Sequence, residues 1–172
     1  YFPQAHTRSQ RAYLEWSTAY AVQHAARLIA VSAATAHDLQ RVYGAPAEKI
    51  VVVHEAATPM PRVAPGEVDA ILQRHAIARP FALFLGTLQP RKNLVRVIEA
   101  YALLHQRGQA RFQLVLAGAD GWLSGEIHAA IERLQLQGSV RTPGAVTETE
   151  SAALFGAAHF FAFPSLFEGF GL

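Results

Sequence analysis

The chain alternates between short apolar runs and longer stretches in which apolar residues recur at helical spacing. The short runs predict strands, and the longer stretches predict helices with one apolar face. Strands are predicted at 27–31, 49–53, 81–85, 112–117, 139–141 and 159–163. Helices are predicted at 9–26, 33–43, 67–75, 93–106, 126–136 and 148–157. Because strands and helices alternate, we expect an α/β fold, with a parallel sheet and helices on both faces.

The strand predicted at 49–53, the stretch 58–66 and the two ends of the chain indicate how the chain is divided into domains. The run 50–53 is β-branched and continuous, which predicts a strand buried on both faces. The stretch 58–66 holds three prolines and a glycine and is the best linker candidate. The chain starts at Tyr1 without a signal-type segment and stops inside an apolar, glycine-containing stretch. We therefore expect an excerpt of a longer chain, divided by a linker.

Composition excludes several classes of protein. Of the 172 residues, 51% are hydrophobic and 16% are charged, so the chain can bury enough apolar surface to fold. No apolar run approaches the ~20 residues of a membrane-spanning helix, which predicts a soluble protein. The absence of cysteine excludes disulfides, thiolate metal sites and cysteine nucleophiles. The net charge is +2 and the arginines are scattered, whereas a nucleic-acid binder normally has a basic stripe.

Only Arg91 and Lys92 place two cations together, in the loop 86–93 that follows a predicted strand. Ligands of parallel α/β sheets bind beyond the carboxyl ends of the strands. Gly86 allows a tight exit from the strand, and Asn93 can cap the next helix. Cations ahead of a helix N-terminus oppose the helix dipole unless an anion such as a diphosphate neutralises them. From spacing alone, an anion-binding loop and a solvated turn both stay open, and neither a Walker loop nor GxGxxG occurs.

Two more loops follow predicted strands. In 164–172, Glu168 could accept hydrogen bonds from sugar hydroxyls, and Gly169 and Gly171 would let backbone amides approach a ligand. By composition alone, an ordinary strand-end turn with a solvated glutamate is favoured there. In 118–122, Asp120 could touch a ligand, but Asp-Gly is a common turn pair and a turn is the favoured interpretation.

The eight histidines are dispersed and none falls in HExxH, and no Asp-x-Asp pair occurs, so we expect no protein-held metal. His54 and Glu55 end the predicted strand 49–53, where a structural role is favoured over ligand contact. A serine hydrolase is disfavoured because no G-x-S-x-G elbow is present.

Taken together, three segments resemble one family. GTLQPRKN at 86–93, GADGWL at 118–123 and PSLFEGFGL at 164–172 resemble motifs of the retaining GT-B glycosyltransferases of the bacterial mannosyltransferase and glycogen-synthase-like type. VSAATAHDL at 31–39 and KIVVVHEAA at 49–57 are similar to the stretch that closes the N-terminal domain of that family. The resemblance covers nearly the whole chain from about Leu28.

This resemblance implies two Rossmann-like domains that face a cleft. Residues 1–57 would be the C-terminal part of the N-terminal, acceptor-side domain, and 58–66 the linker. Residues 67–172 would be an incomplete C-terminal domain that binds the donor nucleotide-sugar.

The resemblance also implies site residues. Lys92 matches the lysine that grips the donor diphosphate, and Arg91 stands beside it, whereas the family's usual arginine position is Thr87 here. Glu168 matches the first carboxylate of the family's paired-glutamate motif, which addresses the donor sugar, and the second would come after Leu172. Catalytic roles are thus implied for Lys92, Arg91 and Glu168. Donor-binding roles, including main-chain contacts to the sugar, phosphate and nucleobase, are implied for Gly86, Thr87, Arg141, Thr142, Val146, Gly169, Phe170, Gly171 and Leu172.

The function implied is transfer of a hexose, with mannose suggested, from a GDP- or UDP-linked sugar to a glycan or lipid-linked acceptor, with retention. Fixed cations at the leaving diphosphate act where negative charge grows, so no metal, cofactor or protein nucleophile is required. We expect a cytoplasmic protein that associates with the inner face of the membrane, and a fragment that binds nucleotide without turnover. The alternatives are a non-catalytic nucleotide-sugar-binding module and, less favoured without a glycine fingerprint, an NAD-type or epimerase Rossmann enzyme.

Overall fold

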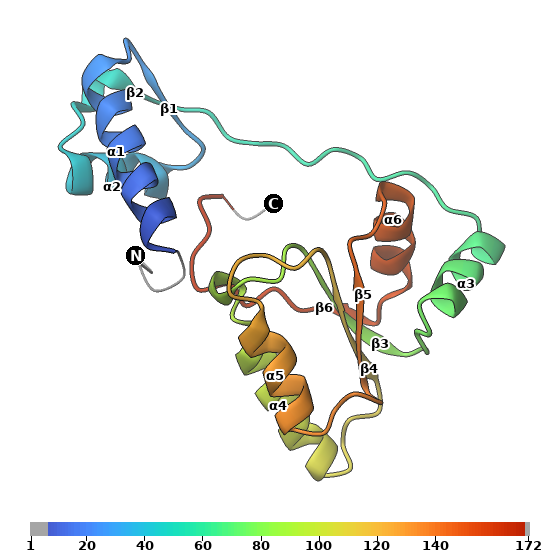
Figure 1. Cartoon of the computed structure of the whole chain (residues 1–172). Helices are drawn as coiled ribbons and strands as arrows, with labels where there is room; N and C mark the ends of the chain where they lie inside the picture. The colour runs from blue at the N-terminus through green and yellow to red at the C-terminus, as the bar shows by residue number, and fades with distance from the viewer. Residues whose placement is uncertain (1–6, 171–172) are drawn as a thin grey trace. The chain divides into compact units, whose positions relative to one another are not determined.

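A computed structural model of the chain describes residues 7–170. The chain divides into two compact units (Figure 1). Unit 1 comprises Tyr1–Thr58 together with Phe167–Leu172, and unit 2 comprises Pro59–Leu166. None of the helices within 7–170 combines the length and hydrophobicity that a membrane-spanning helix needs.

The described part of unit 1 contains two helices and two parallel strands. In chain order these are α1 (Arg8–His24), β1 (Leu28–Ala30), α2 (Ala33–Tyr43), a 3-10 turn (Ala47–Lys49) and β2 (Ile50–Val52). As predicted, Ser32 caps α2 by accepting from the Thr35 N–H, and α2 ends at Gly44 in the left-handed region. Its small core joins the two helices to one face of the sheet, through residues such as Val22, Leu28 and Leu39.

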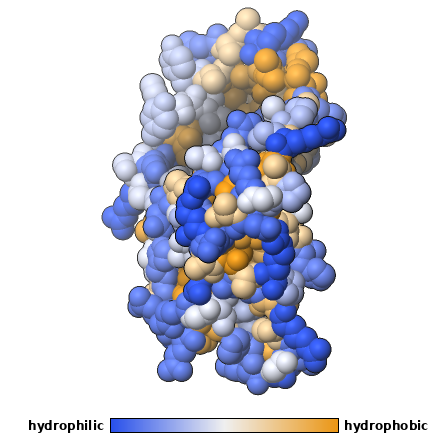
Figure 2. All heavy atoms as spheres, turned by 90° about the vertical axis from the view of Figure 1, so that its right-hand side faces the viewer, coloured by the Kyte–Doolittle hydropathy of each residue, from blue (hydrophilic) through white to orange (hydrophobic). Residues whose placement is uncertain are grey.

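The prediction that the second strand is buried on both faces is wrong. In β1, Leu28 and Ala30 are buried, but Ile29 between them is 71% exposed. Val51 and Val52 of β2 are also exposed, and Figure 2 shows hydrophobic residues (orange) at the surface of the chain. The physical reason is that α1 and α2 cover one face of this sheet, so the alternate residues of its strands point away from the core.

Unit 2 is a four-stranded parallel sheet between two pairs of helices. In chain order it contains α3 (Pro65–Arg74), β3 (Phe81–Leu85), a 3-10 turn (Pro90–Lys92), α4 (Leu94–Gln106), β4 (Gln113–Ala117), α5 (Gly125–Arg133), β5 (Val140–Gly144), α6 (Glu148–Ala157) and β6 (Phe160–Phe161). The strand order is β5-β4-β3-β6. Helix α4 lies beside α5, and helix α3 lies beside α6 (Figure 1). The expected α/β fold with helices on both faces is confirmed.

The central strand β3 shows why a continuous apolar run predicted burial correctly here. Ala82 and Phe84 point into the core under α4 and α5, while Phe81 and Leu83 point into the core under α3 and α6. All four are at most 1% exposed. Both faces of β3 are covered, so every residue of the strand is selected to be apolar.

Some bounds differ from the sequence prediction. The helix α3 begins at Pro65, inside the predicted linker, because proline is well accommodated in the first turn of a helix. The strand β6 keeps only Phe160–Phe161 of the predicted 159–163, since it pairs with β3 over a short register at the edge of the sheet.

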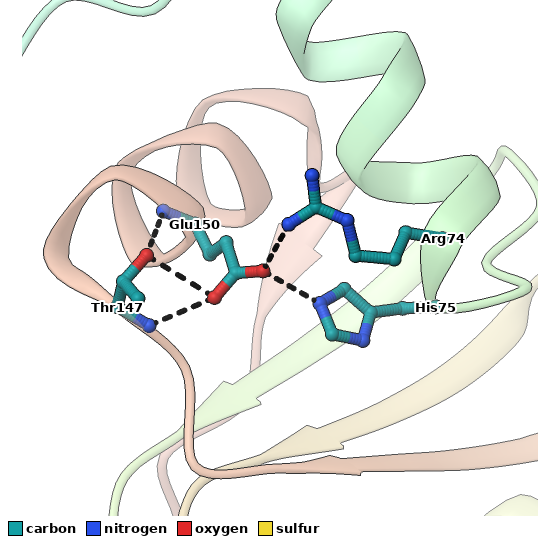
Figure 3. A network of polar contacts seen from close by, with 4 residues as sticks. All are labelled: Arg74, His75, Thr147 and Glu150. Atoms are coloured by element: carbon teal, nitrogen blue, oxygen red, sulfur yellow. Dashed lines mark hydrogen bonds and ion pairs between the residues drawn. The ribbon is translucent and has the colours of Figure 1, made fainter.

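The side chain of Glu150 connects α6 to α3 (Figure 3). One carboxylate oxygen accepts from the Thr147 N–H at 2.9 Å and closes a capping box. The other lies 3.0 Å from Arg74 Nη1 and 3.0 Å from His75 Nε2. The Thr147 backbone N–H, and after it the His75 side chain, lower the pKa of Glu150 from 4.5 to about 2. The carboxylate is therefore held ionised between the two helices.

Candidate functional site

The strand order of unit 2 indicates where on its sheet a ligand would bind. The chain runs from β3 outward through β4 to β5, then returns to place β6 on the other side of β3. The order therefore reverses between β3 and β6. In open parallel sheets, ligands bind outside the carboxyl ends of the strands at such a switch point. The loop after β3 is residues 86–93, here called the cation loop.

The cation loop is tied to the loop that follows β4. Gly86 N donates to Ala117 O, and Leu88 N donates to Ala119 O, each at 2.9 Å. Gly118 has a φ of +144°, and a Cβ there would lie 2.0 Å from the Gly86 carbonyl oxygen. Only glycine permits this approach, so Gly118 fixes where the cation loop leaves the sheet.

The cations stand where the sequence predicted, ahead of a helix N-terminus. Arg91 and Lys92 lie in the 3-10 turn Pro90–Lys92, and α4 begins at Leu94. The expectation that Asn93 caps α4 with its side chain is wrong. Asn93 occupies the N-cap position in the left-handed region, at φ +60°, and makes no capping bond. A capping side chain needs the extended backbone that this turn does not provide.

Lys92 is positioned by the segment after β6. Its Nζ lies 4.3 Å from the centroid of the Phe163 ring, a cation–π distance. The Arg91 carbonyl accepts from Leu166 N at 2.9 Å. Both cationic residues are half-buried. The two segments that flank the switch point are thus fastened to each other, and the two cations lie at that junction.

Two polar atoms at this junction were not singled out by the sequence. Within residues 7–170, the Oε1 of Gln89 and the Oγ of Ser165 are buried and have no hydrogen-bond partner. Gln89 is 5% exposed. A buried polar group without a partner costs about 1–3 kcal/mol, and native proteins keep few of them. No motif could have revealed them, because their burial depends on how the loops after β3 and β6 pack.

The segment with Glu168 belongs to unit 1, where it lies at the carboxyl ends of β1 and β2. The Gly169 carbonyl accepts from Ser32 Oγ, which follows β1. The Phe170 ring lies 5.7 Å from the ring of His54, which follows β2. Glu168 itself is half-buried. The predicted residues Gly171 and Leu172 lie outside the described residues.

Not every predicted residue lies at the switch-point edge. Arg141 donates from Nε to Ala76 O and from Nη1 to Gln137 O, both at 2.9 Å. These carbonyls precede β3 and β5, so the Arg141 guanidinium lies at the amino ends of the strands, whereas the cation loop lies at their carboxyl ends. Its side chain does not share a site with Lys92, and a main-chain contact to the nucleobase stays a prediction. Thr142 is exposed in β5 and Val146 packs against the core, and a main-chain contact of either residue to the nucleobase also stays a prediction.

Asp120 forms an isolated parallel bridge with Leu88, rather than the expected Asp-Gly turn, and pairs with a histidine. Gly121 N donates to Leu88 O, and Asp120 Oδ1 lies 2.7 Å from His128 Nε2 of α5. A Cβ at Gly121 would lie 2.7 Å from Thr87 Cγ2. Residues 120–121 therefore hold the cation loop at the exposed Thr87 and at Leu88. Within residues 7–170, no group of three or more histidine, aspartate or glutamate side chains is arranged to hold a metal ion.

Comparison with known protein families gives two matches. The model described as "Glycosyl transferases group 1" matches residues 68–172, and "Glycosyltransferase Family 4" matches residues 1–59. Among curated proteins, O-antigen chain mannosyltransferase B of Escherichia coli is 32% identical over 173 residues, covering 99% of this chain and 45% of that protein. The serotype-specific mannosyltransferase WbdA of Escherichia coli is 30% identical over 109 residues, 61% of this chain and 13% of that protein. The chain spans less than half of either relative.

Several solved structures share the fold. Sucrose-phosphate synthase of Thermosynechococcus elongatus has a TM-score of 0.74 at 20% identity, over 99% of this chain and 42% of its own. WaaG, a glycosyltransferase of lipopolysaccharide biosynthesis, has a TM-score of 0.71 at 20% identity, over 95% of this chain and 45% of its own. Anabaena HepE, solved with UDP-glucose, has a TM-score of 0.68 at 22% identity, over 90% of this chain and 42% of its own. The expected GT-B type of fold is confirmed by these likenesses.

Proposed function

Because the chain belongs to the group 1 glycosyltransferases, we propose that the protein containing it transfers a hexose from a nucleotide diphosphate sugar to a glycan or lipid-linked acceptor, with retention. Mannose carried by GDP is the donor we propose, since the curated relatives are named mannosyltransferases. The observation that carries the proposal is the pair Arg91 and Lys92 at the switch point of the sheet, ahead of α4.

In this proposal the two cations bind the donor diphosphate. Bond breaking at the sugar leaves negative charge on that diphosphate, so a fixed ammonium there favours the transition state over the ground state. The N-terminal end of α4 adds its own attraction for an anion. Without an anion, the same two cations oppose the dipole of α4. Support comes from the contacts that hold Lys92 in place, through Phe163 and the Leu166–Arg91 hydrogen bond.

We assign the donor sugar to Glu168, whose carboxylate accepts hydrogen bonds from sugar hydroxyls. The main chain of Gly169–Leu172 and of the cation loop residues Gly86 and Thr87 would meet the sugar and the phosphates, and the main chain at 140–142 and 146 the nucleobase. Residues 1–57 then form part of the acceptor-side domain, 58–66 the linker and 67–172 part of the donor domain. We place the protein in the cytoplasm, in peripheral contact with the inner face of the membrane.

The decisive test removes the Lys92 ammonium. Lys92→Ala should weaken GDP binding about 10- to 150-fold, equivalent to the about 1.5–3 kcal/mol of a charged hydrogen bond. Isothermal titration of the full-length protein measures it. Lys49→Ala is the matched control, because Lys49 is the other lysine of the chain and its ammonium contacts the carbonyls of Val22 and Gln23.

Equal GDP affinity in the Lys92→Ala variant and the parent would refute the assignment of the diphosphate to the cation loop. Tight GDP binding by a full-length protein that transfers no sugar would favour the non-catalytic binding module instead.

A further inference from the structure

A single carbonyl in unit 1 receives hydrogen bonds from two hydroxyls far away in the sequence. Ser32 Oγ donates to Gly169 O at 2.6 Å, and Thr35 Oγ1 donates to the same oxygen at 3.2 Å. The two hydroxyl oxygens are 3.1 Å apart. Ser32 and Thr35 come from the N-terminal end of α2, and Gly169 directly follows Glu168. We call this arrangement the hydroxyl clamp.

The two hydroxyls and the carbonyl have enough hydrogens and lone pairs for all the hydrogen bonds of the clamp. A serine hydroxyl has one hydrogen to donate and lone pairs that accept. Ser32 Oγ accepts from Thr35 N at 3.1 Å, which caps α2, so its own hydrogen is available for Gly169 O. The carbonyl oxygen has two lone pairs, one for each hydroxyl. Capping alone would explain the Thr35 N contact but not the donation to Gly169.

The chain is also held at the residue that follows this carbonyl. The Phe170 ring rests against His54, at 5.7 Å between ring centroids. A Cβ added at Gly169 would meet Val31 and Thr35 at 3.6 and 3.7 Å, which is ordinary contact. Packing therefore leaves room for a side chain at 169, and the clamp acts through the carbonyl rather than through close approach of the backbone.

We propose that Ser32 and Thr35 are positioning residues for Glu168. By fixing the carbonyl of the next residue, they set the direction from which the Glu168 carboxylate meets the donor sugar, without touching the donor themselves. The proposal rests on the proposed function, in which Glu168 binds that sugar. Its physical basis is the sensitivity of catalysis to geometry, since misplacement by 1 Å can cost about 100-fold in rate.

Two substitutions separate positioning from helix capping. Ser32→Asp keeps the cap, because aspartate ranks with serine at the N-cap, but its carboxylate has no hydrogen to donate to Gly169 O. Thr35→Val removes the second hydroxyl at nearly the same shape and leaves the Ser32 cap intact. Thr35→Ser restores a hydroxyl at that position. Thr149→Val, at an exposed threonine of α6, is the matched control.

The experiment uses the full-length protein, with steady-state transfer, GDP titration and thermal melting. We expect Ser32→Asp/Thr35→Val to lower kcat about 10- to 100-fold, with GDP affinity and melting temperature close to those of the parent. Thr35→Ser should retain most of the rate, and Thr149→Val all of it. An unchanged kcat in the double variant, a loss that follows the melting temperature, or an equal loss in Thr35→Ser would overturn the proposal.

Glu168→Gln, measured in parallel, keeps the two proposals distinguishable. Full activity in Glu168→Gln would remove the proposed role of Glu168, and the clamp proposal with it. Impaired transfer in Glu168→Gln together with normal transfer in the clamp variant would overturn the clamp alone.

Discussion

The carboxylate of Glu150 shows how much one residue contributes to unit 2. It is 8% exposed, it closes the capping box of α6, and it meets the basic side chains Arg74 and His75 at the end of α3 (Figure 3). An ion pair at the surface contributes little, whereas hydrogen bonds to a buried charge contribute more. Its role is structural, since its partners belong to the α3–α6 junction.

This carboxylate predicts a pH dependence of stability. The folded pKa of about 2 lies below the ordinary 4.5, so the contribution is complete above pH 4.5 and is lost as pH falls toward 2. Glu150→Gln should lower the free energy of unfolding by about 1.5–3 kcal/mol at pH 7, with less difference from the parent at pH 3. Urea unfolding at both values measures it. Glu148→Gln, exposed in the same first turn, is the control, and a gap that stays constant with pH would contradict the assignment.

Single residues were predictable where a motif fixes them, and unpredictable where tertiary packing does. The position of Arg91 and Lys92 ahead of a helix follows from GTLQPRKN, and the structure agrees. The left-handed backbone of Asn93 does not follow from that motif, because asparagine is common both at extended N-cap positions and in the left-handed region. The position of the Arg141 side chain could not be predicted either, because one of the two carbonyls that it meets, Ala76 O, is distant in sequence.

At the scale of elements, the strand ends of unit 2 are coupled by close backbone approach. Gly118 ends β4 at φ +144°, against the carbonyl of Gly86 at the end of β3. Its N–H donates to Gly144 O of β5 at 2.8 Å, so one residue joins the ends of three neighbouring strands. This junction therefore determines the position of the cation loop.

Gly118→Ala should therefore destabilise the protein by about 2–4 kcal/mol, from strain at positive φ and overpacking against Gly86. Thermal and urea unfolding measure the loss. Gly125→Ala is the control, because Gly125 lies in α5 with nothing within 4 Å of an added Cβ, and it should be neutral or stabilising. Comparable stability of both variants would show that the loop after β4 relaxes freely.

Element prediction from sequence worked best in unit 2, where apolar periodicity and burial agree. The strand β3 was predicted at 81–85 and is found there, because both of its faces are covered. The apolar run at 50–53 led to a wrong prediction of burial. A β-branched run indicates strand propensity, and it does not indicate what covers the strand. Ile29 and Val51 illustrate this, each exposed within an apolar run.

At the scale of the whole molecule, the segment 53–64 has neither helix nor strand, and 53–62 is exposed throughout. Proteolytic nicking concentrates in such segments. Limited trypsin treatment should cut first after Arg62, which is exposed in this segment. Mass spectrometry of the first products identifies the site, and Arg62→Gln should delay the cut. A first cut within residues 65–166, for instance after Arg91, would contradict the described order of the helices and strands of unit 2.

The edge strand β6 has a practical consequence for anyone who handles this chain in isolation. It pairs with β3 on one side, and its residues Phe160 and Phe161 are 44% and 40% exposed. A sheet edge with exposed aromatic side chains is a place where another copy can pair, and the two-residue length of β6 limits that pairing. Shielding that border, by a fusion partner or by a charged gatekeeper substitution, is the first step toward a well-behaved preparation.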